Sequence, residues 1–340
     1  ASVTPEKAPE ATAAPCLVLA FCSDLLPSPR KPIKMPEQPY IPMVSLITPC
    51  YNCSAYLPRL LESVLAQNYP RLEHVFIDDG STDNTHKVIE SYRSQYEAKG
   101  ISMVCRQQEN QGPGGAVNHG LKLFTGEFVS MPDSDDFFYP NAISKAVQYF
   151  QLNPECGILQ INNDLFWEND LQRPVGTTFQ RRKYDNINDK SALLEGYLLE
   201  KYQVMASTGL MFRASAFLSI NPKREIYPSR SGQNWQVMLP LIYFTELGLL
   251  EEVQGAILIR HNSHSHALPT TKDRIQRGIE HEKILQETLN SMCLPPDQDL
   301  HFRRLLAIKY HRIRAKLYAK IGAWQKMRQN LSALKKLSAS

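Results

Sequence analysis

Three carboxylates crowd into four consecutive residues, Asp133-Ser134-Asp135-Asp136. Because the pKa of a free Asp side chain is about 3.9, all three are expected to be charged at neutral pH. Charges this close repel one another, and each is costly to remove from water without a partner. A divalent cation relieves both penalties, since Mg²⁺ and Mn²⁺ prefer oxygen ligands. The cluster therefore predicts a site for a hard metal ion. A solvated acidic turn, with Asp136 capping a helix, is the alternative.

Other polar residues follow apolar segments that have the length of buried strands. A strand at residues 43–49 leads to Tyr51, and one at residues 72–77 leads to Asp78 and Asp79. A third strand is expected near residues 101–106, and a fourth runs straight into the acidic cluster. The strand ends therefore hold most of the residues that can do chemistry.

Helical patterns separate these strands. Ser54 is expected to cap a helix with an apolar face, and a second helix is expected to contain Val88, Ile89 and Tyr92. The apolar face of the first helix, with residues three and four apart, holds Leu57, Leu60, Leu61, Val64 and Leu65. Strands that alternate with helices predict a largely parallel sheet covered on both faces. Ligands in such sheets bind beyond the carboxyl ends of the strands.

The first half of the chain resembles the family 2 glycosyltransferases of the GT-A fold. The resemblance covers about residues 43–150, with weaker agreement to about residue 266. Five motifs occur in the family's order: Thr48-Pro49-Cys50-Tyr51-Asn52, Asp78-Asp79-Gly80-Ser81-Thr82-Asp83, Asn110-Gln111-Gly112, Gly126-Glu127-Phe128-Val129 and Asp133-Ser134-Asp135-Asp136. Each motif alone is weakly specific, but five in order are strong.

The resemblance implies an enzyme that binds a nucleotide-sugar, most simply a UDP-sugar, together with Mn²⁺ or Mg²⁺. Asp135 would contact the metal, and Asp133 would lie near both the metal and the ribose. Asp78 would accept a hydrogen bond from the base, which Thr48 and Tyr51 would flank. The full predicted donor-binding set is Thr48, Tyr51, Asn52, Asp78, Asp79, Gly112, Gly115, Asn118, Asp133 and Ser134. An Asx turn that caps the next helix is the structural alternative for Asp78 and Asp79.

The glycine-rich stretch could form a loop around phosphate through Gly112, Gly114 and Gly115, since glycine permits close backbone approach. The spacing matches no Walker or dinucleotide fingerprint. Family members commonly carry Arg-Asn on the following helix, where this chain has Val117-Asn118. The departure removes one possible phosphate contact.

The sequence does not identify the general base of the reaction. Many family members have Glu-Asp before a helix where this chain has Gln233 and Asn234, and an amide cannot accept the acceptor's proton at neutral pH. Three hypotheses follow. Another carboxylate acts as the base, Asn234 and Trp235 position the acceptor while the proton leaves late, or the chain binds without catalysis. The candidate carboxylates are Asp164, Glu168 and Asp170.

Three histidines, His261, His264 and His266, fall where GT-A enzymes often place a loop over the diphosphate. The resemblance implies that one of them, with His264 first, is a further metal ligand. Neutral imidazole can bind such ions. A solvated loop is the alternative.

Composition excludes several other classes. The chain has 340 residues, is 43% hydrophobic and carries a net charge of only +4, which gives no case for nucleic-acid binding. Seven scattered cysteines, including the Cys50 and Cys53 pair, form no disulfide framework and favour a reducing compartment. No apolar run reaches the roughly 18 residues of a membrane span. We therefore expect a cytoplasmic location, and we expect residues 1–40 to be a flexible leader.

The last region is basic and helical. A helix is predicted from about Lys272 to Met292, with a break at Pro295-Pro296 and then one long basic helix. Its apolar positions are Leu306, Tyr310, Ile313, Leu317, Ile321 and Trp324. This helix could pack against the catalytic domain or a second subunit. It could also dock on anionic lipid at the inner face of the membrane, where lipid-linked acceptors lie.

Together these features predict an α/β GT-A fold, a Rossmann-like mixed and mainly parallel sheet flanked by helices. The GT-A domain is expected at residues 41–266, with a nucleotide-binding half at 41–150, an acceptor half at 151–266 and a helical extension at 267–340. The predicted activity is inverting transfer of a sugar to a saccharide, lipid-linked or other hydroxyl acceptor, in polysaccharide or glycolipid synthesis. The alternatives are a noncatalytic binder and a nucleotidyltransferase.

Overall fold

The computed structural model describes residues 40–179, 187–202, 207–260 and 270–339. Its strands are β1 (Val44–Cys50), β2 (Leu72–Asp78), β3 (Ser102–Gln107), β4 (Phe128–Met131), β5 (Phe137–Phe138), β6 (Cys156–Trp167), β7 (Gly176–Thr177), β8 (Ser207–Arg213) and β9 (Glu246–Ile259). Its helices are α1 (Leu57–Leu65), α2 (Thr85–Ser91), α3 (Arg93–Lys99), α4 (Pro113–Leu123), α5 (Ala142–Leu152), α6 (Lys190–Leu198), α7 (Ala214–Ile220), α8 (Gln233–Phe244), α9 (Thr271–Met292), α10 (Pro296–Lys320) and α11 (Trp324–Ala339).

The described strands form one nine-stranded sheet in the order β3-β2-β1-β4-β8-β6-β9-β5, with β7 beside β6. The first four strands along this order are parallel to one another. β8 runs antiparallel to β4 and β6, whereas β6 and β9 are parallel. The predicted mixed, mainly parallel sheet is therefore confirmed, and the carboxyl ends of β1, β2 and β4 share one edge.

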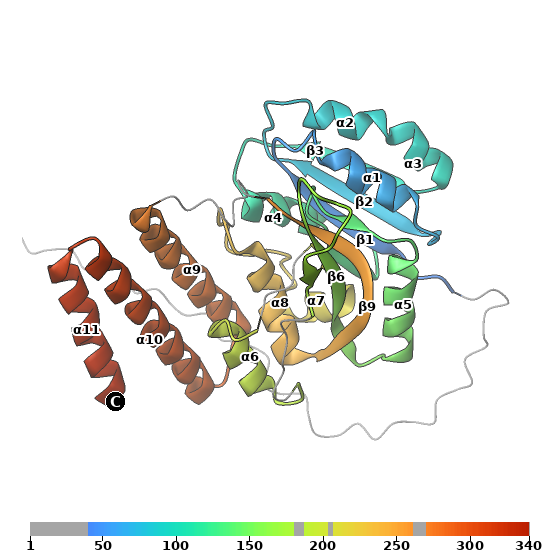
Figure 1. The fold of residues 1–340 in the computed structure, drawn as a ribbon. Coiled ribbons are helices and arrows are strands. Elements are labelled where there is room, and N and C mark those ends of the chain that lie inside the picture. The colour runs from blue at the N-terminus through green and yellow to red at the C-terminus, as the bar shows by residue number, and fades with distance from the viewer. Residues whose placement is uncertain (1–39, 180–186, 203–206, 261–269, 340) are drawn as a thin grey trace, which may run out of the picture. The chain divides into compact units, whose positions relative to one another are not determined.

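Helices cover both faces of this sheet (Figure 1). Successive strand residues point to opposite faces of the sheet, so β1 contributes side chains to two hydrophobic cores. Leu46 packs in the core that holds residues of α1, α2, α3 and α5. Its neighbour Ile47 packs in the core that holds residues of α4, α6 and α8. The alternation explains why β1 and β2 are nearly continuous apolar runs.

The first helix has the predicted apolar face but not the predicted cap. The leucines and the valine of that face are buried, except for Leu65, which is partly buried. Tyr56, not Ser54, is the N-cap residue, and it makes no side-chain capping bond. Ser54 instead donates its backbone N–H to Asp83 at 3.1 Å. The prediction for Ser54 was wrong because the turn before α1 is bonded to the turn after β2.

The predicted long C-terminal helix is two helices. α10 ends at Lys320, and Gly322 takes the left-handed conformation with a φ of 70°. The chain then returns as α11, which lies beside α10 (Figure 1). His311 and Arg314 of α10 both contact the side-chain oxygen of Asn330 in α11. A sequence pattern of apolar residues cannot show this reversal, because it continues in register through the glycine.

The basic helix α10 also packs on the body of the protein. Lys309 donates to the backbone oxygen of Leu198 at the end of α6 and pairs with Glu200 at 2.7 Å. Arg314 pairs with Glu282 of α9. Residues 41–340 form one compact unit, so the packing interpretation of this helix holds for its inner face. The predicted boundaries at residues 150 and 266 stay predictions.

Candidate active site

The turns that follow β1 and β2 are bonded into one frame. Asn52 stands at a left-handed φ of 48°, and its side-chain oxygen accepts the N–H of Thr82 at 2.8 Å. Its own N–H donates to the Ser81 hydroxyl at 3.0 Å. The next N–H, that of Cys53, donates to Thr85 at 2.9 Å. These bonds fix the backbone directly after Tyr51, which is 54% exposed.

Both acidic residues at the end of β2 are buried and accept hydrogen bonds. Asp78 accepts the N–H of Ser81 and the side-chain amide of Gln107, each at 3.0 Å. Asp79 accepts the N–H groups of Gln111 and Gly112, both at 2.8 Å. Asp79 therefore holds the turn before α4, and Asp78 lies at the strand end beside β3.

The glycines before and within α4 have different structural roles. Gly112 is the N-cap residue, with a φ of 82° that favours glycine. Gly114 and Gly115 lie inside the first turn of the helix and are buried. A Cβ at Gly114 would stand 2.5 Å from the backbone oxygen of Ser229, and the Gly114 N–H donates to that oxygen at 2.9 Å. Of the three, only Gly112 belongs to the turn; Gly114 serves helix packing.

An arginine from the second half reaches this turn. Arg230 donates to the side-chain oxygen of Asn110 at 2.8 Å, and its Cγ would lie 2.8 Å from a Cβ at Gly112. The residue is exposed and makes no ion pair among the described residues. The sequence did not predict it, because the contact joins residues 120 positions apart. It supplies a cation where the Arg-Asn pair of the family is absent.

Three predicted donor-binding positions contact other parts of the protein. Thr48 is fully buried, and its hydroxyl lies 3.0 Å from Nε2 of His74. The amide of Asn118 bonds both backbone groups of Ile226, at 2.7 and 2.8 Å. Gly115 packs closely against Gln111, since a Cβ at Gly115 would stand 2.4 Å from the Cβ of Gln111. All three positions therefore make packing or hydrogen-bonding contacts within the protein.

The carboxylates of the acidic cluster after β4 crowd one another. Burial and the neighbouring Asp135 raise the pKa of Asp133 to about 7. Burial, followed by repulsion from Asp135 and Asp133, raises the pKa of Asp136 well above its ordinary value. Asp136 accepts the N–H of Leu258 at 2.8 Å, so it ties the turn to β9 and is not a helix N-cap. Burial and mutual repulsion thus both disfavour the charged forms of Asp133 and Asp136.

One cation already stands in the cluster. Nε of Arg260 lies 2.7 Å from Oδ2 of Asp135, directly after the end of β9. Its guanidinium lies over the ring of Tyr56, 4.6 Å from the ring centre. The Tyr56 hydroxyl donates to Glu168 at 3.3 Å. Asp135, Arg260, Tyr56 and Glu168 therefore form a chain of contacts from the acidic cluster to the end of β6.

The residues present fit a hard cation. Asp133 and Asp135 offer carboxylate oxygens, and a bound cation would offset the burial and the repulsion from Asp135 that raise the pKa of Asp133. Ser134 contacts the thiol of Cys53 and helps to lower its pKa, which places the cluster beside the β1 turn. The cluster, Tyr51 and Asp78 thus lie on one edge of the sheet.

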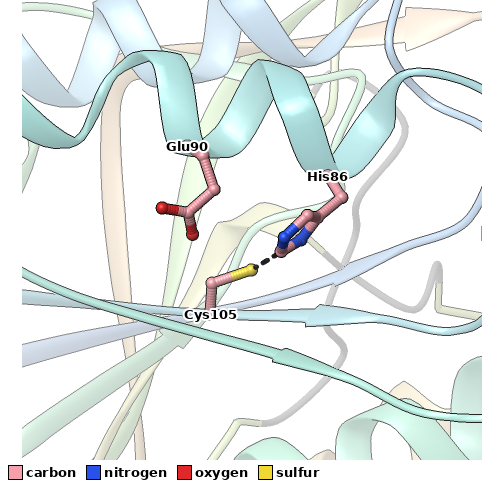
Figure 2. A group of neighbouring side chains, drawn as sticks. All are labelled: His86, Glu90 and Cys105. Carbon is pink, nitrogen blue, oxygen red and sulfur yellow. Dashed lines mark hydrogen bonds between the residues drawn. The ribbon is translucent and has the colours of Figure 1, made fainter.

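A second group of metal-binding side chains lies elsewhere. Figure 2 shows His86 and Glu90 on α2 facing Cys105 on β3, and their ligand atoms lie within 4.8 Å of one another. Glu90 is already paired with Arg93 at 2.7 Å. Burial raises the pKa of Cys105 to about 11, so the thiol keeps its proton and can hydrogen bond to His86. This group stays separate from the acidic cluster in the part of the chain that the structure describes.

The comparisons with known proteins agree with this geometry. The family model for glycosyl transferase family 2 matches residues 45–218, which is half of the chain. The chain belongs to this family. The predicted resemblance is therefore confirmed, and with it the class of enzyme.

Two family 2 relatives each match about a third of this chain. A chondroitin synthase of Escherichia coli is 38% identical over 112 residues, which is 33% of this chain and 16% of that protein. An uncharacterised glycosyltransferase of Nostoc sp. is 40% identical over 116 residues, 34% of this chain and 35% of that protein. The chain thus spans about a third or less of the length of these curated relatives.

Solved structures show the family fold over most of the chain. TarS residues 1–349 of Staphylococcus aureus, in complex with UDP-GlcNAc, has a TM-score of 0.54 and 20% identity over 86% of this chain and 92% of that one. The mannosyltransferase PcManGT of Pyrobaculum calidifontis, with GDP-Man and Mn²⁺, has a TM-score of 0.52 and 16% identity over 88% and 76%. The predicted GT-A fold is confirmed.

The residues that replace the family's Glu-Asp pair begin α8. Gln233 and Asn234 follow Gly232, which has a φ of 70°, and both are partly exposed. Trp235 packs edge-on against His281 of α9, with ring centres 4.7 Å apart. Trp235 is therefore part of the interface between α8 and α9.

The three candidate carboxylates on or after β6 differ in their contacts. Asp164 accepts the hydroxyl of Tyr139 at 2.7 Å, beyond the acidic cluster along the chain. Glu168 accepts a hydrogen bond from the hydroxyl of Tyr56, whose ring lies under the guanidinium of Arg260. Asp170 is exposed, and its side chain accepts the N–H of Gln172. Glu168 is thus the one with a described link to the acidic cluster.

Three predicted residues cannot be placed. His261, His264 and His266 lie outside the described residues, directly after Arg260. The prediction of His264 as a metal ligand stays a prediction. Arg260 itself was missed, although its place beside this histidine segment was a signal that could have found it.

Proposed function

We propose that this family 2 glycosyltransferase moves a sugar from a nucleotide-sugar to an acceptor hydroxyl, with inversion at the anomeric carbon. The observation that carries the proposal is the crowding of the Asp133 and Asp135 carboxylates, beside the exposed ring of Tyr51 and the buried Asp78. A diphosphate with its cation fits such an edge. The UDP-GlcNAc bound to TarS and the GDP-Man bound to PcManGT support this donor class.

The donor residues divide by chemistry. Tyr51 offers a ring face to the base, and Asp78 accepts a ring N–H, which favours uracil. Asp79 acts indirectly, by holding the N–H groups of the turn at Gly112. Arg230, which is hydrogen-bonded to Asn110 beside that turn, would contact a phosphate oxygen of the donor, since a guanidinium suits phosphate geometry. Thr48, Gly115 and Asn118 are left out of this donor set because they are engaged elsewhere.

Asp135, with Asp133 and Ser134 beside it, would hold Mn²⁺ or Mg²⁺, and His264 is retained as a proposed further ligand. When bound, the cation neutralises the charge that gathers on the departing diphosphate. Arg260 holds Asp135 in position through its ion pair. Its guanidinium also adds positive charge on the same side of the sheet.

Glu168 is our choice for the general base. A base must be a carboxylate here, because Gln233 and Asn234 are amides. Glu168 follows β6 and donates its backbone N–H to Ile259, the residue before Arg260. Asp164 is the alternative on the same strand. Gln233 and Asn234, at the start of α8, would then orient the acceptor by hydrogen bonds, with Trp235 fixing that helix end.

The acceptor is proposed to be a saccharide or a lipid-linked hydroxyl, as in polysaccharide or glycolipid synthesis. The chondroitin synthase relative supports a polysaccharide, through a match to 33% of this chain and 16% of that protein.

The test is release of nucleoside diphosphate from a panel of UDP- and GDP-sugars, with Mn²⁺, Mg²⁺ or chelator. We expect one donor to turn over with a metal ion and its rate to rise when an acceptor is added. Release of pyrophosphate instead would support a nucleotidyltransferase. Binding of a donor without any turnover across donors and acceptors would support the noncatalytic alternative that Asn234 suggests.

The base assignment has its own test. Glu168→Gln is expected to lower kcat about a hundredfold while donor affinity stays unchanged, because a general base contributes roughly that much. Asp164→Asn is the matched control, with an expected change of less than about tenfold. The reverse result would transfer the role to Asp164.

A further inference from the structure

The last two helices carry a concentration of positive charge that sugar transfer does not use. Between Leu300 and Ser340 the chain has eleven Lys and Arg residues and no Asp or Glu. Three of these cations are neutralised by acidic partners, namely Arg303, Lys309 and Arg314. All three lie on α10 and lean toward neighbouring elements of the same chain.

The outward side of α11 is different. Asn330 is buried against α10, and on the opposite side Trp324, Arg328, Leu331 and Lys335 follow one another at spacings of four, three and four. This spacing places all four on one helical stripe. All four side chains are exposed, Trp324 by 58% and Leu331 by 43%. The stripe therefore alternates large apolar residues with cations.

The turn before α11 extends the stripe. Ile321 is 41% exposed and stands three residues before Trp324. Exposed cations flank it on both helices: Lys316, Lys320, Lys326 and Lys336. No ion pair involves any of these four among the described residues. A soluble surface has no need to expose Trp and Leu in a row, so the pattern points to a partner.

We propose that this stripe docks on an anionic lipid bilayer, with α11 lying in the plane of the interface. Trp and Leu would enter the boundary between headgroups and acyl chains, while Arg328 and Lys335 meet lipid phosphates. Charge complementarity favours lipid over a second copy of this chain, because two copies would bring the same exposed cations against one another. The apolar residues favour lipid over nucleic acid, which needs cations but not a Leu-containing stripe.

Docking in this way differs from membrane spanning. Among the described helices none is both long and apolar enough to cross a bilayer. An amphipathic helix on the surface needs only one apolar stripe and adjacent cations. The inner side of α10 would anchor this surface to the body through Lys309 and Leu198. The proposal does not depend on the donor or the metal.

The test is sedimentation of the full chain with vesicles of phosphatidylcholine, with and without phosphatidylglycerol. We expect binding only to the anionic vesicles, weakening as salt is raised. Arg328→Gln with Lys335→Gln should lower the partition coefficient about 25-fold, since each cation near the surface contributes about fivefold. Trp324→Ala should lower the partition coefficient further. In the wild type, tryptophan emission should shift to shorter wavelength on binding to vesicles, and this shift should be absent in Trp324→Ala.

Lys87→Gln with Lys99→Gln is the matched control, because both lysines are exposed on the α2 and α3 side of the protein. It should leave vesicle binding unchanged. The proposal is overturned by absence of binding to anionic vesicles or by equal loss in the control. It is also overturned if Trp324→Ala has no effect while double-stranded DNA binds as tightly as the vesicles. All the altered side chains are exposed, so thermal unfolding of each variant should match that of the wild type.

Discussion

Asp78 and Asp79 end β2, and Asp133 and Asp135 follow β4 at the same edge of the sheet, yet their surroundings are opposite. Asp79 takes two backbone N–H groups and a side-chain amide, so its charge is satisfied by the protein. Asp133 is partly buried next to a second carboxylate, and burial together with that neighbour raises its pKa to about 7. Arg260 is the cation that the described structure brings to this second group.

The difference separates two uses of the same residue type. A carboxylate satisfied by N–H donors builds the frame and contributes to folding. A carboxylate left short of positive charge is held ready for a ligand. Substitutions at the two sites should therefore fail in different ways, one in stability and the other in chemistry.

Asp135→Ala should give the largest effect and the sharpest contrast. We expect metal-dependent release of nucleoside diphosphate to fall about a thousandfold, because a cation contributes several kcal/mol to such a step. The free energy of unfolding should change by less than about 1 kcal/mol, since the lost ion pair with Arg260 is partly exposed. Turnover at the wild-type rate would remove Asp135 from the metal site.

Asp79→Ala should show the reverse. Removing its carboxylate leaves the N–H groups of Gln111 and Gly112 without their acceptor, at a cost of about 3 kcal/mol of unfolding free energy. Urea unfolding measures this loss. Glu97→Ala, at an exposed residue of α3, is the control and should stay within about 0.5 kcal/mol of wild type. A full loss of turnover in a stable Asp79 variant would break the comparison.

His74 tests the frame by pH. It is fully buried in β2 between Thr48 and Tyr96, and burial lowers its pKa to about 3. Below the unfolded pKa of about 6.5 the unfolded chain binds a proton that the folded protein refuses, so this stability is present at pH 7 and lost as pH falls toward 3. Between pH 7 and pH 5 the loss due to His74 should be about 2 kcal/mol.

The measurement compares urea unfolding of wild type and His74→Gln at the two pH values. The variant starts from a lower stability, but its loss on acidification should be smaller by the amount that His74 contributes. Equal losses in the two proteins would mean that His74 is protonated in the folded state.

Arg230→Gln should give the smallest effect. Glutamine can still bond Asn110, so the turn should stay intact, while the affinity for the nucleotide-sugar should fall about tenfold through loss of one charged contact. Isothermal titration at two salt concentrations measures this change. Lys223→Gln removes an exposed cation from the same segment and should leave the affinity unchanged. A similar drop in both variants would reduce the role of Arg230 to general charge.

The sequence predicted the sheet and the strand-end residues because both depend on local patterns. Period and length identified β1, β2 and β4, and the polar residues after these strands include Tyr51, Asp78 and Asp133. The sequence did not predict the cap of α1 or the contacts of Thr48 and Asn118, because these depend on partners in other elements.

The second half was harder to predict for the same reason. Arg230 and Arg260 reach the donor edge only through folding, and neither belongs to a motif of the first half. The reversal at Gly322 interrupts no apolar pattern, so one long helix and two antiparallel helices look alike in sequence.

The contact between the backbones of Gly114 and Ser229 limits how this protein can be joined to parts of its relatives. The Nostoc and Escherichia coli relatives each match only about a third of this chain, so one way to combine family members is to graft the first half of this chain onto the second half of another. Yet any side chain at Gly114 would strike the backbone of Ser229, and the N–H of Gly114 must find a carbonyl there. A functional chimera therefore has to take the segment around Ser229 and Arg230 from the same parent as α4. A chimera joined at the midpoint of the sequence would separate the two.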